Sequence, residues 1–168
     1  MSRQKDEIIA ALGLVPSTRC GWTAGTYRSA DAVPADGPPA RFGGPRPLGS
    51  ALLFLVAPEL PTRLHRLRSD QMYHHYRGDD LEVLLLHPDG RGEVVTLGGD
   101  PAAGGLMQLL IPGGTYHLSR SRGPHGYALL ATTAWPAPVD GDADFGDPAA
   151  LAEAYPAMRA AIADFCGT

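Results

Sequence analysis

The sequence lacks most features that mark membrane-spanning, nucleic-acid-binding or disulfide-rich proteins. Its longest apolar stretch, residues 51–57, is far shorter than the roughly 18 residues that a spanning helix needs. Lys5 is the only lysine, the other basic residues are scattered arginines, and the formal net charge is −4. This charge balance argues against nucleic acid or an anionic membrane as a partner. Cys20 and Cys166 lie near opposite ends and form neither a CxxC pair nor a zinc spacing, so free thiols are expected.

Familiar catalytic motifs are missing as well. There is no glycine loop followed by lysine to cradle phosphate, no G-x-S-x-G elbow and no H-E-x-x-H helix. The polar N-terminal residues lead into a short amphipathic stretch rather than the apolar segment of a secretory signal, so a cytoplasmic location is expected.

The remaining composition suits one soluble domain. With 168 residues the chain can bury a real core, and 44% hydrophobic with 19% charged residues is typical of a globular protein. We expect a single domain over residues 1–168. It would comprise an N-terminal helix, short strand and Pro/Gly-rich loop (1–49), a barrel (50–138), and an acidic loop with a C-terminal helix (139–168).

Hydrophobic periodicity predicts an all-β protein with a helix at each end. Helical spacing covers residues 6–14 and 148–165, a short strand covers 22–29, and a Pro/Gly-rich loop follows over 31–49. That loop would form either a lid over the barrel mouth or a segment packed on a partner subunit. From residue 50 on, short strands at intervals of roughly 8–12 residues predict a sandwich or barrel. The expected strands are 51–56, 64–67, 71–76, 81–87, 92–97, 106–111, 116–120 and 127–135.

His117 stands in the most informative context. Residues 105–117 read as a strand, a turn made by Pro112 and Gly114, and a second strand that opens on this histidine. A histidine placed in this way, with other histidines on an upstream strand, would be a metal ligand; otherwise it is a packed core histidine.

Two such segments together resemble the cupin motifs. Residues 65–78, with His65, Gln71 and Gly78, follow the spacing H-x-H-x3-E-x6-G, and residues 112–121, with Pro112, Gly114 and His117, follow P-x-G-x2-H-x3-N. The sequence around them resembles that of the cupin-5 group, including Leu12-Gly-Leu14-Val-Pro16 and Thr26-Tyr-Arg-Ser29 near the N-terminus. The resemblance covers about residues 6–165 and implies a cupin double-stranded β-helix, a jelly-roll barrel with the site inside.

In cupins, three histidines and a glutamate of these motifs hold a divalent metal. Here Leu67 replaces the second histidine and Gln71 replaces the glutamate, whereas His117 is present although cupin-5 proteins often lack it. The resemblance therefore implies a metal site of His65, Gln71 and His117, for iron, zinc, nickel or manganese, whose reduced ligand charge leaves a strong Lewis acid. The alternative is a degenerate cupin whose histidines only hydrogen-bond a polar ligand or each other.

Neighbouring residues are candidates for proton transfer. Strand alternation places Gln71, Tyr73 and His75 on one face and His74 on the other. Tyr73 would donate its phenol to a substrate or simply pack, and His75 would be a fourth ligand, a general base or a space-filling histidine. Glu82 would face the barrel as an acid or base, or pair with Arg68 or Arg77.

The leading functional hypothesis is a metal-assisted isomerase, epimerase, cyclase or lyase that acts on a polar metabolite. It names a class of reaction and no particular substrate, because cupins host many chemistries. An iron-dependent dioxygenase is the second enzyme hypothesis. A metal-free protein that binds a sugar-like or nucleotide-like ligand is the hypothesis from a different class. In each case we expect a homodimer.

Overall fold

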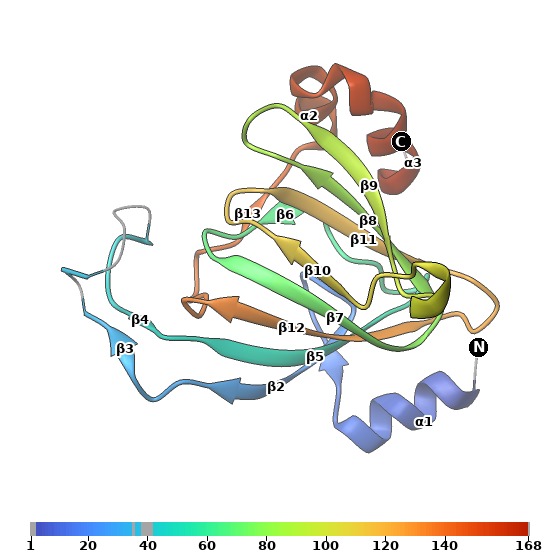
Figure 1. Ribbon diagram of the computed structural model, residues 1–168, viewed down its shortest axis with the longest axis horizontal. Coiled ribbons are helices and arrows are strands. Elements are labelled where there is room, and N and C mark those ends of the chain that lie inside the picture. The colour runs from blue at the N-terminus through green and yellow to red at the C-terminus, as the bar shows by residue number, and fades with distance from the viewer. Residues whose placement is uncertain (1–2, 35, 38–41, 168) are drawn as a thin grey trace.

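Short strands form two antiparallel sheets that face each other across a common interior (Figure 1). The computed structural model describes residues 3–34, 36–37 and 42–167. The first sheet has the order β1 (Val15–Pro16), β2 (Trp22–Arg28), β5 (Ser50–Val56), β12 (Ala128–Trp135), β7 (Asp70–Gly78) and β10 (Gln108–Ile111). The second has the order β13 (Asp144–Phe145), β6 (His65–Arg66), β11 (Tyr116–Arg122), β8 (Asp80–Leu86) and β9 (Gly92–Leu97). The jelly-roll barrel expected from the sequence is confirmed.

The interior between the sheets is apolar over most of its length. Residues of β7 alternate between buried and more exposed positions, as expected for a strand with one face on the core. Side chains from both sheets interdigitate, as in other two-sheet folds. The main interior cluster contains Phe54, Val56, Tyr73, Leu81, Val83, Leu85, Leu97, Ile111, Ala128 and Leu130.

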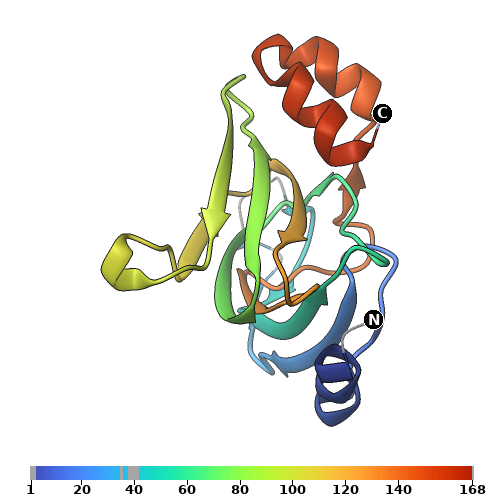
Figure 2. The same cartoon turned by 90° about the vertical axis from the view of Figure 1, so that its right-hand side faces the viewer.

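Helices cover the outer faces of both sheets (Figures 1 and 2). Helix α1 (Arg3–Leu12) packs Ile8 and Ile9 against the six-stranded sheet, where Leu55 and Leu129 are buried. Helices α2 (Pro148–Ala154) and α3 (Arg159–Cys166) cover the outer apolar residues of β8 and β11. No helix in the described part of the chain has both the length and the apolar character needed to cross a membrane.

The C-terminal segment departs from the single helix predicted over residues 148–165. Asp147 caps α2 through a 2.8 Å bond from the Ala150 amide, but the helix ends before Tyr155, and a short 3-10 turn, η3 (Pro156–Met158), precedes α3. Proline lacks an amide proton and disfavours helical backbone in the residue before it, so Pro156 breaks the helix. The predicted apolar face survives the break, because Leu151, Tyr155 and Ile162 still pack on the sheet.

Several short elements lie outside the predicted strands. Besides β1 and β13, they include a two-residue ladder between β3 (Ala32–Val33) and β4 (Arg46–Pro47), and the 3-10 turn η2 (Pro101–Ala103). The ladder lies within the predicted loop 31–49. Residues 35 and 38–41, on which the lid prediction partly rests, lie outside the described residues.

Two glycines with positive φ illustrate different constraints on the barrel ends. Gly90 (φ 88°) closes the β8–β9 hairpin in open space, and its amide donates to the His87 carbonyl at 3.0 Å. Gly78 (φ 97°) ends β7, and a Cβ added there would lie 2.3 Å from the Tyr127 carbonyl oxygen. Both backbone conformation and close backbone contact therefore require glycine at position 78.

This difference predicts unequal costs for two matched substitutions. Gly90→Ala should lower the free energy of unfolding by about 1 kcal/mol, the cost of a left-handed conformation alone. Gly78→Ala should lower the free energy of unfolding by clearly more, because the added methyl also collides with the Tyr127 carbonyl just before β12. Urea denaturation followed by circular dichroism measures both, and equal losses would show that the contact at Gly78 relaxes freely.

Candidate functional site

Two histidines face each other on adjacent strands of the five-stranded sheet. His65 of β6 and His117 of β11 are direct register partners, and their ring centroids lie 4.3 Å apart. Both side chains are almost completely buried, with 2% and 1% exposure. The barrel therefore holds a pair of imidazoles in its interior.

Backbone carbonyls fix the tautomer of both rings. The Nδ1 of His65 lies 2.7 Å from the Arg63 carbonyl oxygen, and the Nδ1 of His117 lies 3.2 Å from that of Thr115. Because a carbonyl oxygen only accepts, each Nδ1 carries the proton and donates it. The Nε2 atoms of the two neutral rings therefore carry the lone pairs, as in metal-binding histidines, whose other ring nitrogen donates to a carbonyl or carboxylate.

The opposite sheet contributes two further polar groups. Gln71 of β7 places its amide Nε2 at 3.5 Å from the His117 Nε2, to which it donates. Tyr73, also on β7, lies edge-on to His117 with 5.9 Å between ring centroids. Ser119 follows His117 on the same face of β11. Its buried Oγ makes no hydrogen bond of good geometry among the described residues, but it lies close enough to the Tyr73 hydroxyl to lower the pKa of that phenol. These groups span the interior from both sheets.

Burial controls the protonation of the cluster. Desolvation and, to a smaller extent, the neighbouring His117 lower the pKa of His65 to about 2. Desolvation also lowers the pKa of His117 to about 4, although its bond to the Thr115 carbonyl opposes the shift. Burial raises the pKa of Tyr73 above its usual range. At neutral pH the site therefore contains two neutral imidazoles and a protonated phenol.

His75 shares the buried face of β7 with Gln71 and Tyr73, as the alternation predicted, but it does not join the cluster. Its Nε2 bonds to the Asp79 carbonyl oxygen at 2.9 Å, which holds the ring near the far end of the strand. Four residues along a strand correspond to about 13 Å, so His75 is too distant from Gln71 to share a ligand. His74 lies on the outer face, where its Nε2 contacts the Thr133 hydroxyl at 3.0 Å.

The prediction that Glu82 faces the barrel interior is wrong. Leu81 and Val83 pack into the interior cluster, which places Glu82 on the outer face. There its carboxylate accepts from Arg120 Nε at 2.8 Å and lies 3.3 Å from Arg122 Nε. The error arises because α2 and α3 cover the outer face of β8, so both of its faces carry leucine and alternation alone does not distinguish them.

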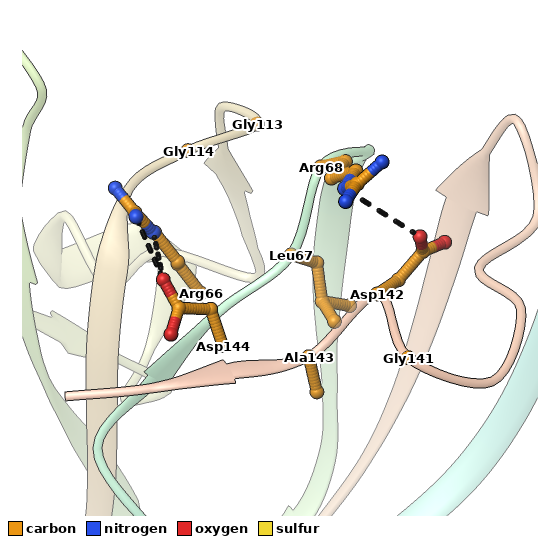
Figure 3. Close-up of a pocket in the computed structure, with 9 residues that line it drawn as sticks. All are labelled: Arg66, Leu67, Arg68, Gly113, Gly114, Gly141, Asp142, Ala143 and Asp144. Atoms are coloured by element: carbon orange, nitrogen blue, oxygen red, sulfur yellow. Dashed lines mark hydrogen bonds and ion pairs between the residues drawn. The ribbon is translucent and has the colours of Figure 1, made fainter. Parts of the chain in front are cut away.

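A cleft of about 540 Å³ is lined by chain neighbours of His65 and His117, but not by the side chains of the cluster itself (Figure 3). It is lined by the residues that follow His65, by Gly113 and Gly114 of the turn before His117, and by residues 141–144. Arg66 pairs with Asp144 at 2.7 Å, and Arg68 lies 3.8 Å from Asp142. Leu67 is buried at the position where the first motif has its second histidine, so it supplies no ligand.

The donor set has only two members of the usual metal-binding types. Within the described ranges, no three His, Cys, Asp or Glu side chains gather closely enough to hold a metal ion. A third protein ligand must therefore come from a neutral group, and Gln71 is the one beside His117.

Comparison with known families shows which family the sequence belongs to. The family model described as "Cupin superfamily (DUF985)", the cupin-5 family, matches residues 6–145. The chain belongs to the cupin superfamily. Among curated proteins, none matches its sequence.

Solved structures show the same cupin architecture over nearly the whole chain. A hypothetical protein from Leishmania major is 29% identical, with a TM-score of 0.82 over 95% of this chain and 97% of that one. A protein from Shewanella oneidensis is 27% identical, with a TM-score of 0.80 over 98% and 97%. A cupin-2 domain protein from Rhodospirillum rubrum, 15% identical, covers 92% of this chain and 86% of its own with a TM-score of 0.59, which shows the fold alone.

Sequence analysis missed several groups around the cupin site. Ser119 was within reach, because it alternates with His117 on a predicted strand. The carbonyls of Arg63 and Thr115 could not be predicted in this way, because they accept from His65 and His117 only in one orientation of the imidazole rings. The same holds for Arg19, whose charge influences His65, His117 and Tyr73.

The two buried imidazoles predict a pH-dependent stability. Between the ordinary pKa of 6.5 and about 4, unfolded histidines bind protons that His65 and His117 cannot bind in the folded state. The free energy of unfolding should therefore fall as pH falls through this window, by about 1.4 kcal/mol per pH unit for each histidine.

Urea titrations of chelator-treated protein at several pH values test this prediction. His117→Gln should reduce the slope by about one proton. His125→Gln removes an exposed histidine instead and serves as the control. An equal reduction in both variants would contradict the assignment of the slope to the buried pair.

Proposed function

We propose that this cupin is a metal-dependent small-molecule enzyme of the isomerase, epimerase, cyclase or lyase type that acts on a polar metabolite. His65, His117 and Gln71 would hold a divalent metal inside the barrel. The observation that supports this most strongly is the facing pair of neutral imidazoles, each with Nδ1 bonded to a carbonyl and Nε2 directed to the interior.

The chemistry of the donor set fits a borderline divalent metal. Neutral imidazole nitrogens suit zinc, iron, nickel and manganese. Gln71 would complete three protein ligands with its amide oxygen, once the amide turns and gives up the bond from its Nε2 to His117. None of these ligands is charged, so the metal would keep nearly its full positive charge and act as a strong Lewis acid on a substrate oxygen. The Ser119 hydroxyl, beside the Tyr73 phenol, would offer a polar contact to a substrate or water.

Tyr73 is the hydrogen-bond donor that the structure favours. It lies beside His117, and burial raises its pKa, so the phenol keeps its proton at neutral pH. It would therefore donate a hydrogen bond to a substrate oxygen that gains negative charge, while keeping its own proton. His75 and Glu82 do not serve this purpose, because both are bonded elsewhere in the barrel wall.

Two alternatives differ in the ligands they require. An iron-dependent dioxygenase of the common type uses two histidines and a carboxylate, whereas Gln71 stands in the carboxylate position here. A metal-free binding protein needs only the hydrogen-bonding groups of the cluster. The shortage of acidic ligands among the described residues favours this second alternative over the first.

Other expectations from the sequence remain predictions. They are a homodimer, a cytoplasmic location, and the absence of nucleic acid and membrane among the partners.

Elemental analysis of freshly purified protein tests the proposed metal site. We expect close to one metal per chain in the wild type or after reconstitution with iron, zinc, nickel or manganese. His117→Ala should lose it, because a single imidazole and an amide bind weakly. His74→Ala removes a histidine from the outer face of the same barrel and should retain the metal. If no metal binds to the wild type, or if His117→Ala binds it equally, the proposal is wrong and the metal-free alternative gains support.

The neutral third ligand makes a second, opposite prediction. Gln71→Glu should tighten metal binding by about tenfold or more, equivalent to about 1.4 kcal/mol, because it adds a negative charge beside the cation. Competition with a metal-sensitive chelator dye measures the affinity. Gln108→Glu adds the same charge on the exposed edge strand β10 and should change little. Unchanged affinity in Gln71→Glu would place the metal away from Gln71.

A further inference from the structure

A short loop over residues 17–21, here called the Arg19 loop, is rigidly closed on itself. The Ser17 amide donates to the Gly21 carbonyl at 2.8 Å, and the Ser17 hydroxyl accepts from the amides of Arg19 and Cys20 at 3.2 and 3.4 Å. Gly21 has φ 51°, and a Cβ there would lie 2.0 Å from the Leu55 carbonyl oxygen. The loop is thus fixed against β5.

The same loop is bonded to the chain that carries the first histidine. The Arg63 amide donates to the Arg19 carbonyl at 2.8 Å, while the Arg63 carbonyl accepts from His65 Nδ1 at 2.7 Å. A single residue therefore links Arg19 to the imidazole of His65.

A second connection leads to the strand of the other histidine. Cys20 forms a β-bridge with Thr62. The Thr62 hydroxyl donates to the Ser119 carbonyl and accepts from the Ser119 amide, both at 2.7 Å. Ser119 lies two residues after His117 on β11, so the loop is held relative to both histidines.

The Arg19 side chain brings a positive charge that no carboxylate balances. It is half-buried and forms no ion pair within the part of the chain that the structure describes. Its charge reaches His65, His117 and Tyr73, which come from three different strands, and it lowers the pKa of each. The other charged group that influences His65 is Arg63, also a cation. Arg19 is therefore a cation near both imidazoles, and its backbone is held beside the segment that carries His65.

The other arginines near the site have partners of their own. The guanidinium of Arg63 stacks 4.1 Å above the Phe145 ring. In the cleft beside β6, Arg66 faces Asp144 and Arg68 faces Asp142 (Figure 3). On the outer face of β11, Arg120 is paired with Glu82 and Asp164. Arg19 differs from these because its charge is left for a ligand.

We propose that Arg19 is a specificity-determining residue of the imidazole site and selects a small substrate that carries an oxyanion, a carboxylate or a phosphate. This inference rests on the proposed function and deepens it by naming the substrate class. The guanidinium would pair with the anionic group, since its planar donors match the oxygens of carboxylate and phosphate. The neutral end of the substrate would then lie against Gln71, Tyr73 and the imidazoles.

Calorimetric titration with malonate and inorganic phosphate tests this inference, with uncharged malonamide as the comparison. Chelator-treated and metal-reconstituted protein are both titrated. We expect the wild type to bind at least one anion and to prefer malonate over malonamide. Arg19→Gln should weaken anion binding by about tenfold, the effect of losing a charge-assisted bond, and leave malonamide binding unchanged.

Two control variants separate selectivity from structure. Arg19→Lys keeps the charge and should recover part of the lost affinity. Arg77→Gln removes one positive charge from the exposed end of β7 and should bind anions as the wild type does. Urea denaturation of Arg19→Gln establishes that the variant is folded.

The outcomes distinguish this inference from the metal proposal. Anion binding that depends on Arg19 in chelator-treated protein supports the inference even if elemental analysis finds no metal. Equal anion affinity in Arg19→Gln and wild type overturns it even if the metal site is established. Failure of the wild type to bind either anion in both preparations also overturns it.

Discussion

Removal of the imidazoles of His65 and His117 from water is the constraint on which the site depends. In water a histidine gains and loses its proton near neutral pH, whereas here burial keeps both rings uncharged. Neutral rings have a free lone pair, and the carbonyls of Arg63 and Thr115 decide which nitrogen bears it. The same desolvation keeps the phenol of Tyr73 protonated. Ligand capacity and hydrogen-bond-donating capacity thus have one physical origin.

The two ends of the barrel serve different purposes. At one end the cluster of Gln71, His65 and His117 leaves polar atoms directed into the interior. At the other end the Asp79 carboxylate accepts from the amides of His125 and Gly126, and its carbonyl holds His75. Polar groups there are satisfied by one another, which stabilises a loop and leaves nothing for a ligand. Similar residue types on one strand therefore have contrasting roles.

Much of this arrangement follows from the sequence. Strand alternation and Pro/Gly turns predicted the barrel, and the two motif spacings brought together His65, Gln71 and His117, because register in a sheet is fixed by which face is buried. Alternation failed at Glu82, where helices cover the outer face and make both faces of β8 apolar. Periodicity over 148–165 also outweighed the signal of Pro156, although that proline was plainly visible in the sequence.

The Arg19 loop marks a firmer limit to prediction. Its position depends on backbone bonds to Arg63 and Thr62, and backbone groups are the same in every residue. No pattern of side chains predicts such a backbone contact between segments that are distant in the sequence. Only the folded chain shows that a basic residue near the N-terminus lies beside histidines of the barrel.

The Thr62 hydroxyl takes the place of a peptide group beside β11. By donating to one backbone atom of Ser119 and accepting from another, it reproduces both halves of a strand pairing with one side chain. The main chain at residues 62 and 63 is thereby released from β11 and pairs instead with Cys20 and Arg19. Because the Thr62 side chain bonds to β11, the backbone of the same segment is free to pair with residues 19 and 20. One hydroxyl oxygen thereby connects the N-terminal region to the strand that carries His117.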